Sequence, residues 1–278
     1  MSLPFMKHLE ENFDAEKQHV WFAHNWWLSC AFSVLYFVGV FAGRAWMEDR
    51  PKFDLRGALT IWSGCLAIFS IIGAVTTIGD LVDYVTRTGW HGSICDATIF
   101  DGRIGLWTWL FIMSKAPELG DTVFIVLRKQ KLIFLHWYHH ITVLIYSWYS
   151  YRDQIAPARY FIVANFTVHA VMYSYYALRA SGVVKIPRQV NISITLMQLI
   201  QMVIGCVVNI YALLQLNSGT RCDTTYQNVA WSLAMYFSYF VLFAQFFYKT
   251  YLTPSPKKDT SKYRYSKEMN GNHQVKMD

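Results

Sequence analysis

Seven apolar runs, each long enough to cross a lipid bilayer, constrain the fold of this chain more than any other feature. A transmembrane helix takes roughly 17 to 25 residues. Hydrophobic residues make up 54% of the chain and charged residues 15%, against about 25% charged residues in soluble domains. The pattern predicts an all-α integral membrane protein with seven transmembrane helices. The runs cover about residues 26–43, 57–79, 104–127, 132–151, 160–178, 190–216 and 229–248.

The distribution of Lys and Arg predicts how these helices are oriented. The segments after the first, third and fifth runs, together with the tail, hold 17 of the 25 basic residues, and basic residues concentrate on the cytosolic side. We therefore expect residues 1–25 to be a non-cytosolic segment, residues 26–248 the seven-span domain and residues 249–278 a basic cytosolic tail. That tail holds seven basic and three acidic residues, so the net charge of +7 indicates a solvated tail and no nucleic-acid partner.

This topology separates the five cysteines into two classes. Cys30, Cys65 and Cys206 lie in apolar runs, where a reduced thiol behaves as a small apolar side chain. Cys95 and Cys222 lie in loops on the non-cytosolic side, where the compartment is oxidising. We expect these two to form a disulfide bond. Two free thiols are the alternative, because a bridge requires a specific geometry.

Four of the apolar runs also carry polar side chains at helical spacing. With a rise of about 1.5 Å per residue, these groups reach one layer about 10 to 13 Å from the cytosolic ends of the helices. A buried charge costs about 2.5 to 3.5 kcal/mol in a membrane, so the layer indicates a function or a dense polar network. Its members are Lys115, Glu118, Asp121 and Thr122 on one face of the third run; His136, His139 and His140; Asn165, His169, Tyr173 and Tyr176; and Thr195, Gln198 and Gln201.

Structural roles remain open for some of these residues. Lys115 and Glu118 stand three residues apart, so they can neutralise each other or take part in catalysis directly. The polar residues of the sixth run can hold helices together through hydrogen bonds. One hydroxyl of the tyrosine cluster at residues 173–176 can face the site. Three histidines within five residues of an apolar helix are harder to explain structurally and predict a catalytic site.

Two chemistries suit the histidine cluster. Neutral imidazole binds iron, as in membrane desaturases and hydroxylases, but only four of the nine histidines reach the shared layer. Neutral imidazole also has a lone pair that can attack a thioester or take up a proton. Basic residues at the rims can bind a polyphosphate headgroup or simply anchor the helices; they are Arg128, Lys129, Lys131, Arg179, Lys185 and Arg188. A seven-span transporter or receptor, with the buried charges as a relay or ligand site, is the non-enzymatic alternative.

Four motifs in this layer resemble those of the very-long-chain fatty acid elongase family, the 3-oxoacyl-CoA synthases of the endoplasmic reticulum. KAPELGDT at residues 115–122 is similar to the KxxELxDT element of the family, and HWYHH at residues 136–140 to its HxxHH box. HAVMYSYY at residues 169–176 and TLMQLIQ at residues 195–201 also match. The resemblance covers nearly all of residues 26–250. Trp137 in the box points to the branch of the third and sixth animal elongases, and most to the sixth.

The resemblance implies a reaction and its setting. It implies condensation of a saturated or monounsaturated acyl-CoA of roughly twelve to sixteen carbons with malonyl-CoA, in an apolar tunnel where each buried methylene contributes about 0.8 kcal/mol. It implies residence in the endoplasmic reticulum membrane, no metal or other cofactor, and the reductase and dehydratase of the elongation cycle as partners. A homodimer is a further expectation. The end of the chain, QVKMD, departs from the dilysine retrieval signal of many relatives.

The resemblance also implies a role for each histidine. His139 attacks the thioester to form an acyl-imidazole, a ping-pong intermediate. His136 or His140 transfers protons, and His169, Gln198 and Lys115 are candidate donors to the enolate formed when malonyl-CoA loses carbon dioxide.

Overall fold

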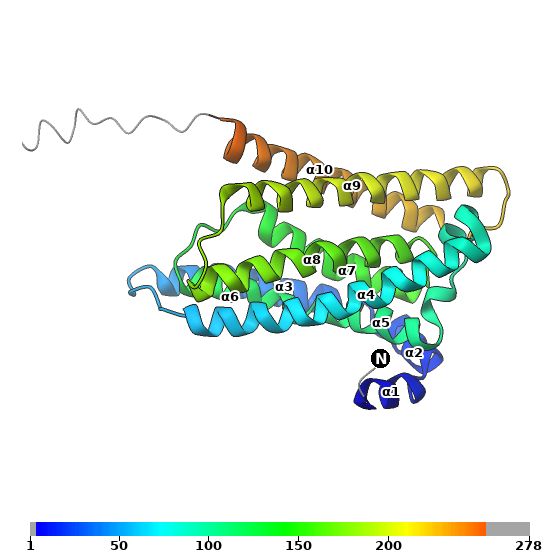
Figure 1. Ribbon diagram of the computed structural model, residues 1–278, viewed down its shortest axis with the longest axis horizontal. Coiled ribbons are helices and arrows are strands. Elements are labelled where there is room, and N and C mark those ends of the chain that lie inside the picture. The colour runs from blue at the N-terminus through cyan, green and yellow to red at the C-terminus, as the bar shows by residue number, and fades with distance from the viewer. Residues whose placement is uncertain (1–3, 254–278) are drawn as a thin grey trace, which may run out of the picture.

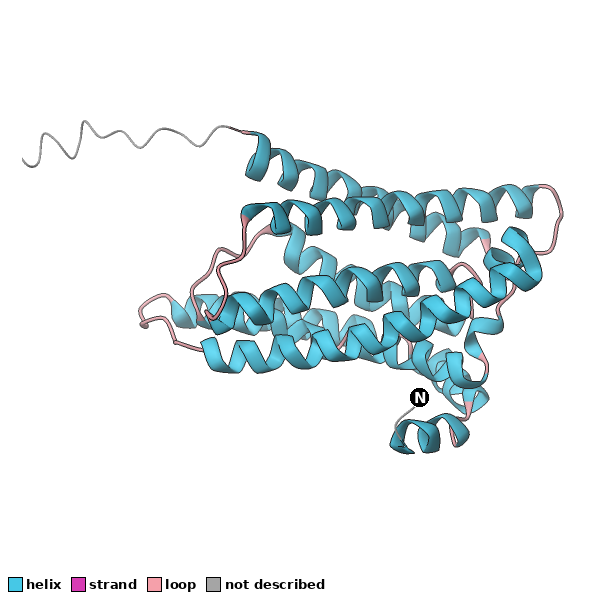
Figure 2. Cartoon of the chain, in the orientation of Figure 1, coloured by secondary structure: helices cyan, strands magenta, loops and turns pink. Residues whose placement is uncertain are grey.

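The computed structural model describes residues 4–253, and over that range the chain consists of helices and loops (Figures 1 and 2). The all-α prediction is thus confirmed for these residues. The helices are α1 (Pro4–Glu11), α2 (Ala15–Asn25), α3 (Leu28–Met47), α4 (Arg56–Cys95), α5 (Gly102–Ser114), α6 (Gly120–Leu127), α7 (Phe134–Arg152), α8 (Ala158–Ser181), α9 (Arg188–Asn217) and α10 (Tyr226–Phe247), with short 3-10 turns at Thr98–Phe100 and Pro117–Leu119 and a π turn at Tyr248–Leu252.

Several of these helices can cross a membrane. By length and composition, α3, α4, α8, α9 and the segment Tyr226–Leu252 qualify as spans, which makes the chain a multi-pass membrane protein. The third apolar run and α7, with its three histidines, do not meet the same criteria within the described residues. The expected seven spans therefore stay a prediction.

The third apolar run differs from its prediction, because it is not one continuous helix. It is divided into α5 and α6 by the 3-10 turn at Pro117–Leu119. Pro117 has no N–H to donate and its ring opposes a regular helix, and the backbone N–H groups of Lys115, Ala116 and Leu119 each bond three residues back instead of four. Asp121 and Thr122 therefore lie on α6, after the break, whereas Lys115 and Glu118 lie before it and within it.

Helix α4 is longer than the apolar run that predicts it. It continues to Cys95, about sixteen residues beyond the expected end at residue 79, with a kink at Gly89, whose φ is 73°. At about 1.5 Å per residue, forty helical residues measure about 60 Å, about twice the thickness of a bilayer core. The final turns of α4 therefore extend past the apolar layer.

Two antiparallel helix pairs form the frame of the bundle (Figure 1). Helix α4 makes its most extensive contact with α8, where the ring of Phe166 lies so near Gly73 that an added Cβ would stand 2.6 Å from it. Helix α9 packs along α10, where an added Cβ on Gly205 would stand 2.4 Å from the Tyr236 ring. Small residues allow this close approach of helices in membrane proteins.

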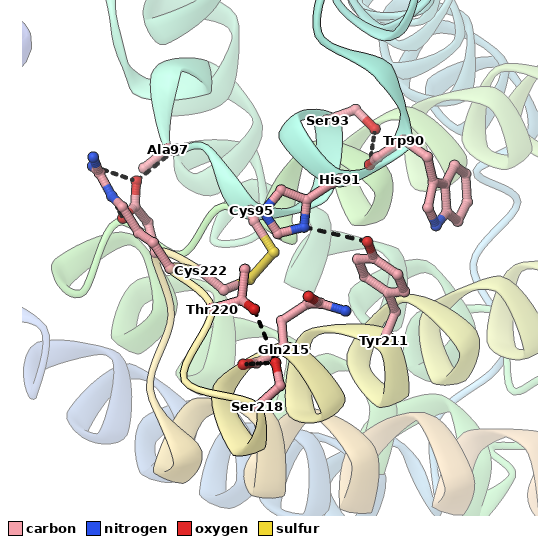
Figure 3. The surroundings of a disulfide bond; sticks show 12 residues. Trp90, His91, Ser93, Cys95, Ala97, Tyr211, Gln215, Ser218, Thr220 and Cys222 are labelled. Atoms are coloured by element: carbon pink, nitrogen blue, oxygen red, sulfur yellow. Dashed lines mark hydrogen bonds and ion pairs between the residues drawn. A yellow bond between two sulfur atoms is a disulfide. The ribbon is translucent and has the colours of Figure 1, made fainter.

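A disulfide bond between Cys95 and Cys222 joins the end of α4 to the α9–α10 loop, and it is the pair expected from the sequence. Figure 3 shows that bond and, beside it, His91 Nδ1 at 3.2 Å from the hydroxyl of Tyr211. We call this the disulfide end of the bundle. The opposite end, at which α4 begins, α6 and α8 end and α9 begins, we call the basic end, because Arg56, Arg128, Arg179 and Arg188 lie there.

Breaking the disulfide is expected to lower stability without removing the cavity described below. Removing a native disulfide typically costs about 2 to 5 kcal/mol, so Cys95→Ser, Cys222→Ser and the double variant should share one lowered melting temperature in detergent. Cys206→Ser is the matched control, because that cysteine is free. Melting temperatures unchanged by the single variants would contradict the prediction.

Two features predicted for the tail lie outside the described residues. They are its basic residues from Lys257 to Lys276 and the incomplete retrieval signal at the end of the chain.

Candidate functional site

A cavity of about 520 Å³ runs from the basic end into the bundle. This volume lies within the range of roughly 300 to 1,000 Å³ typical of small-molecule sites. It brings together most of the polar groups that the sequence assigns to one layer, from the third, fourth, fifth and sixth apolar runs. Asn165 of that layer lines the cavity, whereas Lys115 and Thr122 do not. Those predicted site residues that line it are Glu118, Asp121, His136, His139, His140, His169, Tyr173, Tyr176, Thr195, Gln198, Gln201, Arg179 and Arg188.

The four histidines differ in what their rings contact. The Nε2 atom of His136 lies 2.9 Å from the hydroxyl of Thr122, and the ring of His140 packs against it at a centroid distance of 4.5 Å. His169 Nε2 lies 3.2 Å from the amide nitrogen of Asn165. Among the described residues, the ring nitrogens of His139 have no hydrogen-bond partner, and the ring faces the cavity. The ring of His140 lines the same cavity, and its Nδ1 is buried without a partner. His139 differs from His140 in that it also borders the smaller cavity described below.

Lys115 is buried and fully engaged, with 2% of its surface exposed. Its Nζ donates to both carboxylate oxygens of Glu118, at 2.7 and 3.0 Å, and to the side-chain oxygen of Asn165 at 3.0 Å. Glu118 also accepts from the hydroxyl of Ser114 at 2.9 Å. Since an ammonium group has three donors, no donor of Lys115 remains for a substrate, and the geometry matches the neutralising role among the two left open by the sequence.

Asp121 and Thr122 are held by different helices. The carboxylate of Asp121 accepts from Trp62 Nε1 of α4 and from the hydroxyl of Tyr173 of α8, each at 2.7 Å. Thr122 instead lies 2.6 Å from the hydroxyl of Tyr36 of α3 and also contacts His136. Asp121 and Thr122 are neighbours on α6, so their side chains leave that helix in different directions and reach different partners.

The sixth apolar run supplies the wall opposite the histidines. Thr195 donates to its own helix, to Asn191 O at 3.0 Å, and Gln198 Nε2 approaches only the sulfur of Met172, at 3.6 Å. Gln198 and Gln201 both line the cavity. Gln198 thus makes only this weak hydrogen bond to another helix, and its amide is available to a ligand.

A small cavity of about 60 Å³ adjoins the principal one on the side of the disulfide end. The two share His139, Asn165, Gln201 and Met202. Apolar and aromatic side chains make up most of the rest of its wall, among them Phe111, Ile112, Phe161, Ile162, Met235 and Tyr236. His139 therefore stands where the cavity lined by the four histidines meets a smaller, more apolar one.

The six predicted headgroup-binding residues separate into three groups. Arg188 lines the mouth of the principal cavity, where its guanidinium lies 5.7 Å from the Tyr251 ring. Arg128 instead lines a third cavity, of about 580 Å³, and Arg179 lines both. The remaining three do not line either of these cavities among the described residues: Lys129, whose Nζ donates to the Glu48 carbonyl at 2.9 Å, Lys131 and Lys185.

Several residues of the site escaped sequence analysis. Trp62 and Tyr36 hold Asp121 and Thr122, yet in sequence they resemble the aromatic residues that anchor any membrane helix. Tyr239 of α10 packs against the His139 ring at a centroid distance of 4.9 Å, but no histidine or charged residue near it in the sequence marked it. Arg56 was counted among the basic residues that predict the orientation of the helices, but it was not predicted to line a cavity.

The histidines do not form a metal-ligand set in the part of the chain that the structure describes. No three His, Cys, Asp or Glu side chains of residues 4–253 converge as metal ligands.

A multi-pass helical membrane protein with a histidine-lined internal cavity is the class that the fold and the site define. Comparison with known proteins gives the family: residues 21–259 match the family described as ELO: GNS1/SUR4 family. The chain therefore belongs to the fatty acid elongases, a family of condensing enzymes of the acyltransferase type.

Relatives agree with the branch that Trp137 predicts. The chain is 49% identical to very long chain fatty acid elongase 6 of Drosophila melanogaster, covering 90% of this chain and 80% of that protein. It is 49% identical to elongase 6 of Homo sapiens, covering 87% and 91%, and 40% identical to human elongase 3, covering 90% and 92%. The resemblance to the third and sixth elongases, and most to the sixth, is confirmed.

Proposed function

We propose that this chain is a 3-oxoacyl-CoA synthase that condenses a long-chain acyl-CoA with malonyl-CoA and releases carbon dioxide and CoA. The position of His139 carries the proposal, because its ring lies where the histidine-lined cavity meets the small apolar one. An acyl-CoA that enters from the basic end would bring its thioester to His139 and the start of its tail to the small cavity, whose volume of about 60 Å³ accommodates only part of a long chain. The preferred substrate is a saturated or monounsaturated chain of roughly twelve to sixteen carbons, held at about 0.8 kcal/mol per buried methylene.

The first half of the reaction transfers the acyl group to the enzyme. A ring nitrogen of His139 attacks the thioester carbon, the bond from carbon to sulfur breaks, and CoA leaves as an acyl-imidazole forms. A histidine bonded to other protein groups would have to give up those bonds first. The enclosing helices exclude water, which protects the acyl-imidazole from hydrolysis.

The second half joins the two carbon chains. Malonyl-CoA loses carbon dioxide, and the resulting enolate attacks the acyl carbon and releases His139. Donors aimed at a developing oxyanion are worth most when they are fixed beforehand; His169, held by Asn165, and Gln198 serve this role. His136 or His140 transfers protons. Lys115 orders Asn165 and Glu118 and has no donor left for the enolate.

The membrane arrangement that goes with this function has seven spans, the third being the broken pair α5 and α6. The basic end faces the cytosol and the disulfide end the lumen of the endoplasmic reticulum, so residues 1–25 are lumenal, residues 26–248 form the elongase domain, and residues 249–278 form the cytosolic tail. The enzyme needs no metal or cofactor, works with the reductase and dehydratase of the elongation cycle, and forms a homodimer in the lipid bilayer.

The test of the proposed function uses the purified full chain in detergent with a sixteen-carbon acyl-CoA. With malonyl-CoA we expect 3-oxoacyl-CoA two carbons longer; without it, one equivalent of CoA and an acyl-sized gain in protein mass. Formation of 3-oxoacyl-CoA without an acyl adduct would refute the ping-pong mechanism, whereas the assignment as a synthase would still hold. Stoichiometric iron together with no product would favour a desaturase or hydroxylase, and ligand-driven flux without CoA release a transporter or receptor.

A further inference from the structure

The basic end of the bundle has two mouths. The principal cavity opens between α8, α9 and the turn after α10, beside Arg188 and Tyr251. The third cavity, of about 580 Å³, opens between α4, α6 and α8, beside Arg56 and Arg128. The two adjoin inside the bundle, because both are lined by Asp121, His136, Tyr176 and Arg179. Each cavity therefore reaches the histidine layer, the third one at His136.

The third cavity carries an excess of positive charge. Arg56, Arg128 and Arg179 line it, against one lining carboxylate, that of Asp121, whose two oxygens accept from Trp62 and Tyr173. Arg56 also forms an exposed ion pair with Asp54, at 3.8 Å. The Arg128 guanidinium has no partner among the described residues. Planar guanidinium groups bind phosphate oxygens in pairs, so the cavity fits a ligand that carries several phosphates.

The inner end of the third cavity limits what else that ligand can carry. It ends at His136 and Asp121, and the residues that join the principal cavity to the small apolar one, including His139 and Met202, do not line it. A long acyl tail consequently has an apolar chamber to enter only from the principal mouth. A short, polar acyl group suffices for the third cavity.

We propose that the third cavity is the binding site for malonyl-CoA, separate from the mouth that admits the long-chain acyl-CoA. This inference rests on the proposed function. The phosphates bind Arg56, Arg128 and Arg179, and the malonyl group reaches the His136 side of the acyl-imidazole. There the bond from the malonyl methylene to its carboxylate breaks and carbon dioxide leaves. The electron pair forms the new bond to the acyl carbon, and the bond from that carbon to the nitrogen of His139 breaks and returns its electrons to the ring.

The experiment separates the two mouths by the substrate that each variant affects. Arg56→Gln and Arg128→Gln are each expected to raise the KM for malonyl-CoA about tenfold, the loss of roughly one charge-assisted hydrogen bond, while acyl-CoA alone still releases one equivalent of CoA at the wild-type concentration. Arg188→Gln should leave the KM for malonyl-CoA unchanged and should raise the concentration of acyl-CoA needed for CoA release. Arg50→Gln, at the same end but stacked on Trp46 and lining neither mouth, should leave both values unchanged. Arg128→Lys, which keeps the charge, should recover part of the loss.

Three results would overturn the proposal. An equal rise in the KM for both substrates in Arg56→Gln and Arg128→Gln means one shared mouth, and no rise in either means that the cavity binds no substrate. A malonyl-CoA effect that appears with anionic lipid but vanishes in uncharged detergent assigns the arginines to a lipid headgroup. If the wild-type protein itself makes no 3-oxoacyl-CoA, the proposed function fails, and that result is visible before any variant is compared.

Discussion

Replacing His139 with alanine is expected to abolish both CoA release on acyl-CoA alone and the acyl-sized gain in protein mass. Overall condensation should fall at least about a thousandfold, because the loss of a covalent nucleophile removes a whole reaction path. The prediction is specific to His139, since the rings of His136 and His169 are bonded to Thr122 and Asn165. The ring of His140 has an unpartnered Nδ1, but it does not line the small apolar cavity that His139 borders. Intact-protein mass spectrometry and CoA titration measure the two effects.

The control for this prediction is another histidine that contacts the protein only. His91→Ala removes a ring near the disulfide end that contacts Tyr211, and it should keep the adduct and the rate. His139→Gln preserves a polar side chain of similar reach, so a folded but inactive protein would separate chemistry from folding. An adduct that persists in both His139 variants would place the nucleophile on another residue of the layer.

Removing one member of the buried pair Lys115 and Glu118 is expected to produce the largest loss of stability. Both are almost fully buried, with 2% and 3% of their surfaces exposed, and breaking such a pair typically costs about 3 to 5 kcal/mol, because the remaining charge stays in a dry interior. Lys115→Met leaves Glu118 with the hydroxyl of Ser114 as its close donor. The melting temperature in detergent should fall sharply.

A double variant distinguishes a structural pair from a catalytic one. Lys115→Met combined with Glu118→Gln removes both charges, so stability should return most of the way to the wild-type value. CoA release should nevertheless stay impaired, because Asn165 and His169 lose the groups that order them. Arg87→Met is the matched control: its partner Asp83 and Arg87 itself are exposed, and such a surface pair contributes about 0 to 1 kcal/mol. A double variant as unstable as the single ones would contradict this account.

Local properties of the sequence were enough to predict much of the molecule. The apolar runs follow from side-chain composition within one segment, and the polar layer follows from helical period and rise, which any helix obeys. The pairing of Cys95 with Cys222 was predicted from the topology that the basic residues indicate, which puts both loops on the same side. The four motifs identified the family, because each motif is a pattern of residues along one segment of the sequence.

The ends and breaks of helices were predicted less well. The apolar run ending near residue 79 gave no sign that α4 continues to Cys95, because a helix can leave the apolar layer and continue as a polar helix. The prediction for the third run used the spacing of three between Lys115 and Glu118, which fits a regular helix, and took no account of Pro117, whose ring opposes one. The backbone resolves that conflict in favour of a 3-10 turn.

Sequence alone determined the class, the family and the residues of the polar layer, since these depend on composition and on spacing along one helix. Only the tertiary structure decided which side chains contact one another. It shows that Lys115 donates to Glu118 and Asn165 and that Trp62 donates to Asp121. It also shows that the ring of His139 has no hydrogen-bond partner among the described residues. It also divided the basic rim into two mouths. The physical reason is that a cavity and a hydrogen bond depend on the directions of side chains from helices far apart in the sequence, which no local pattern records.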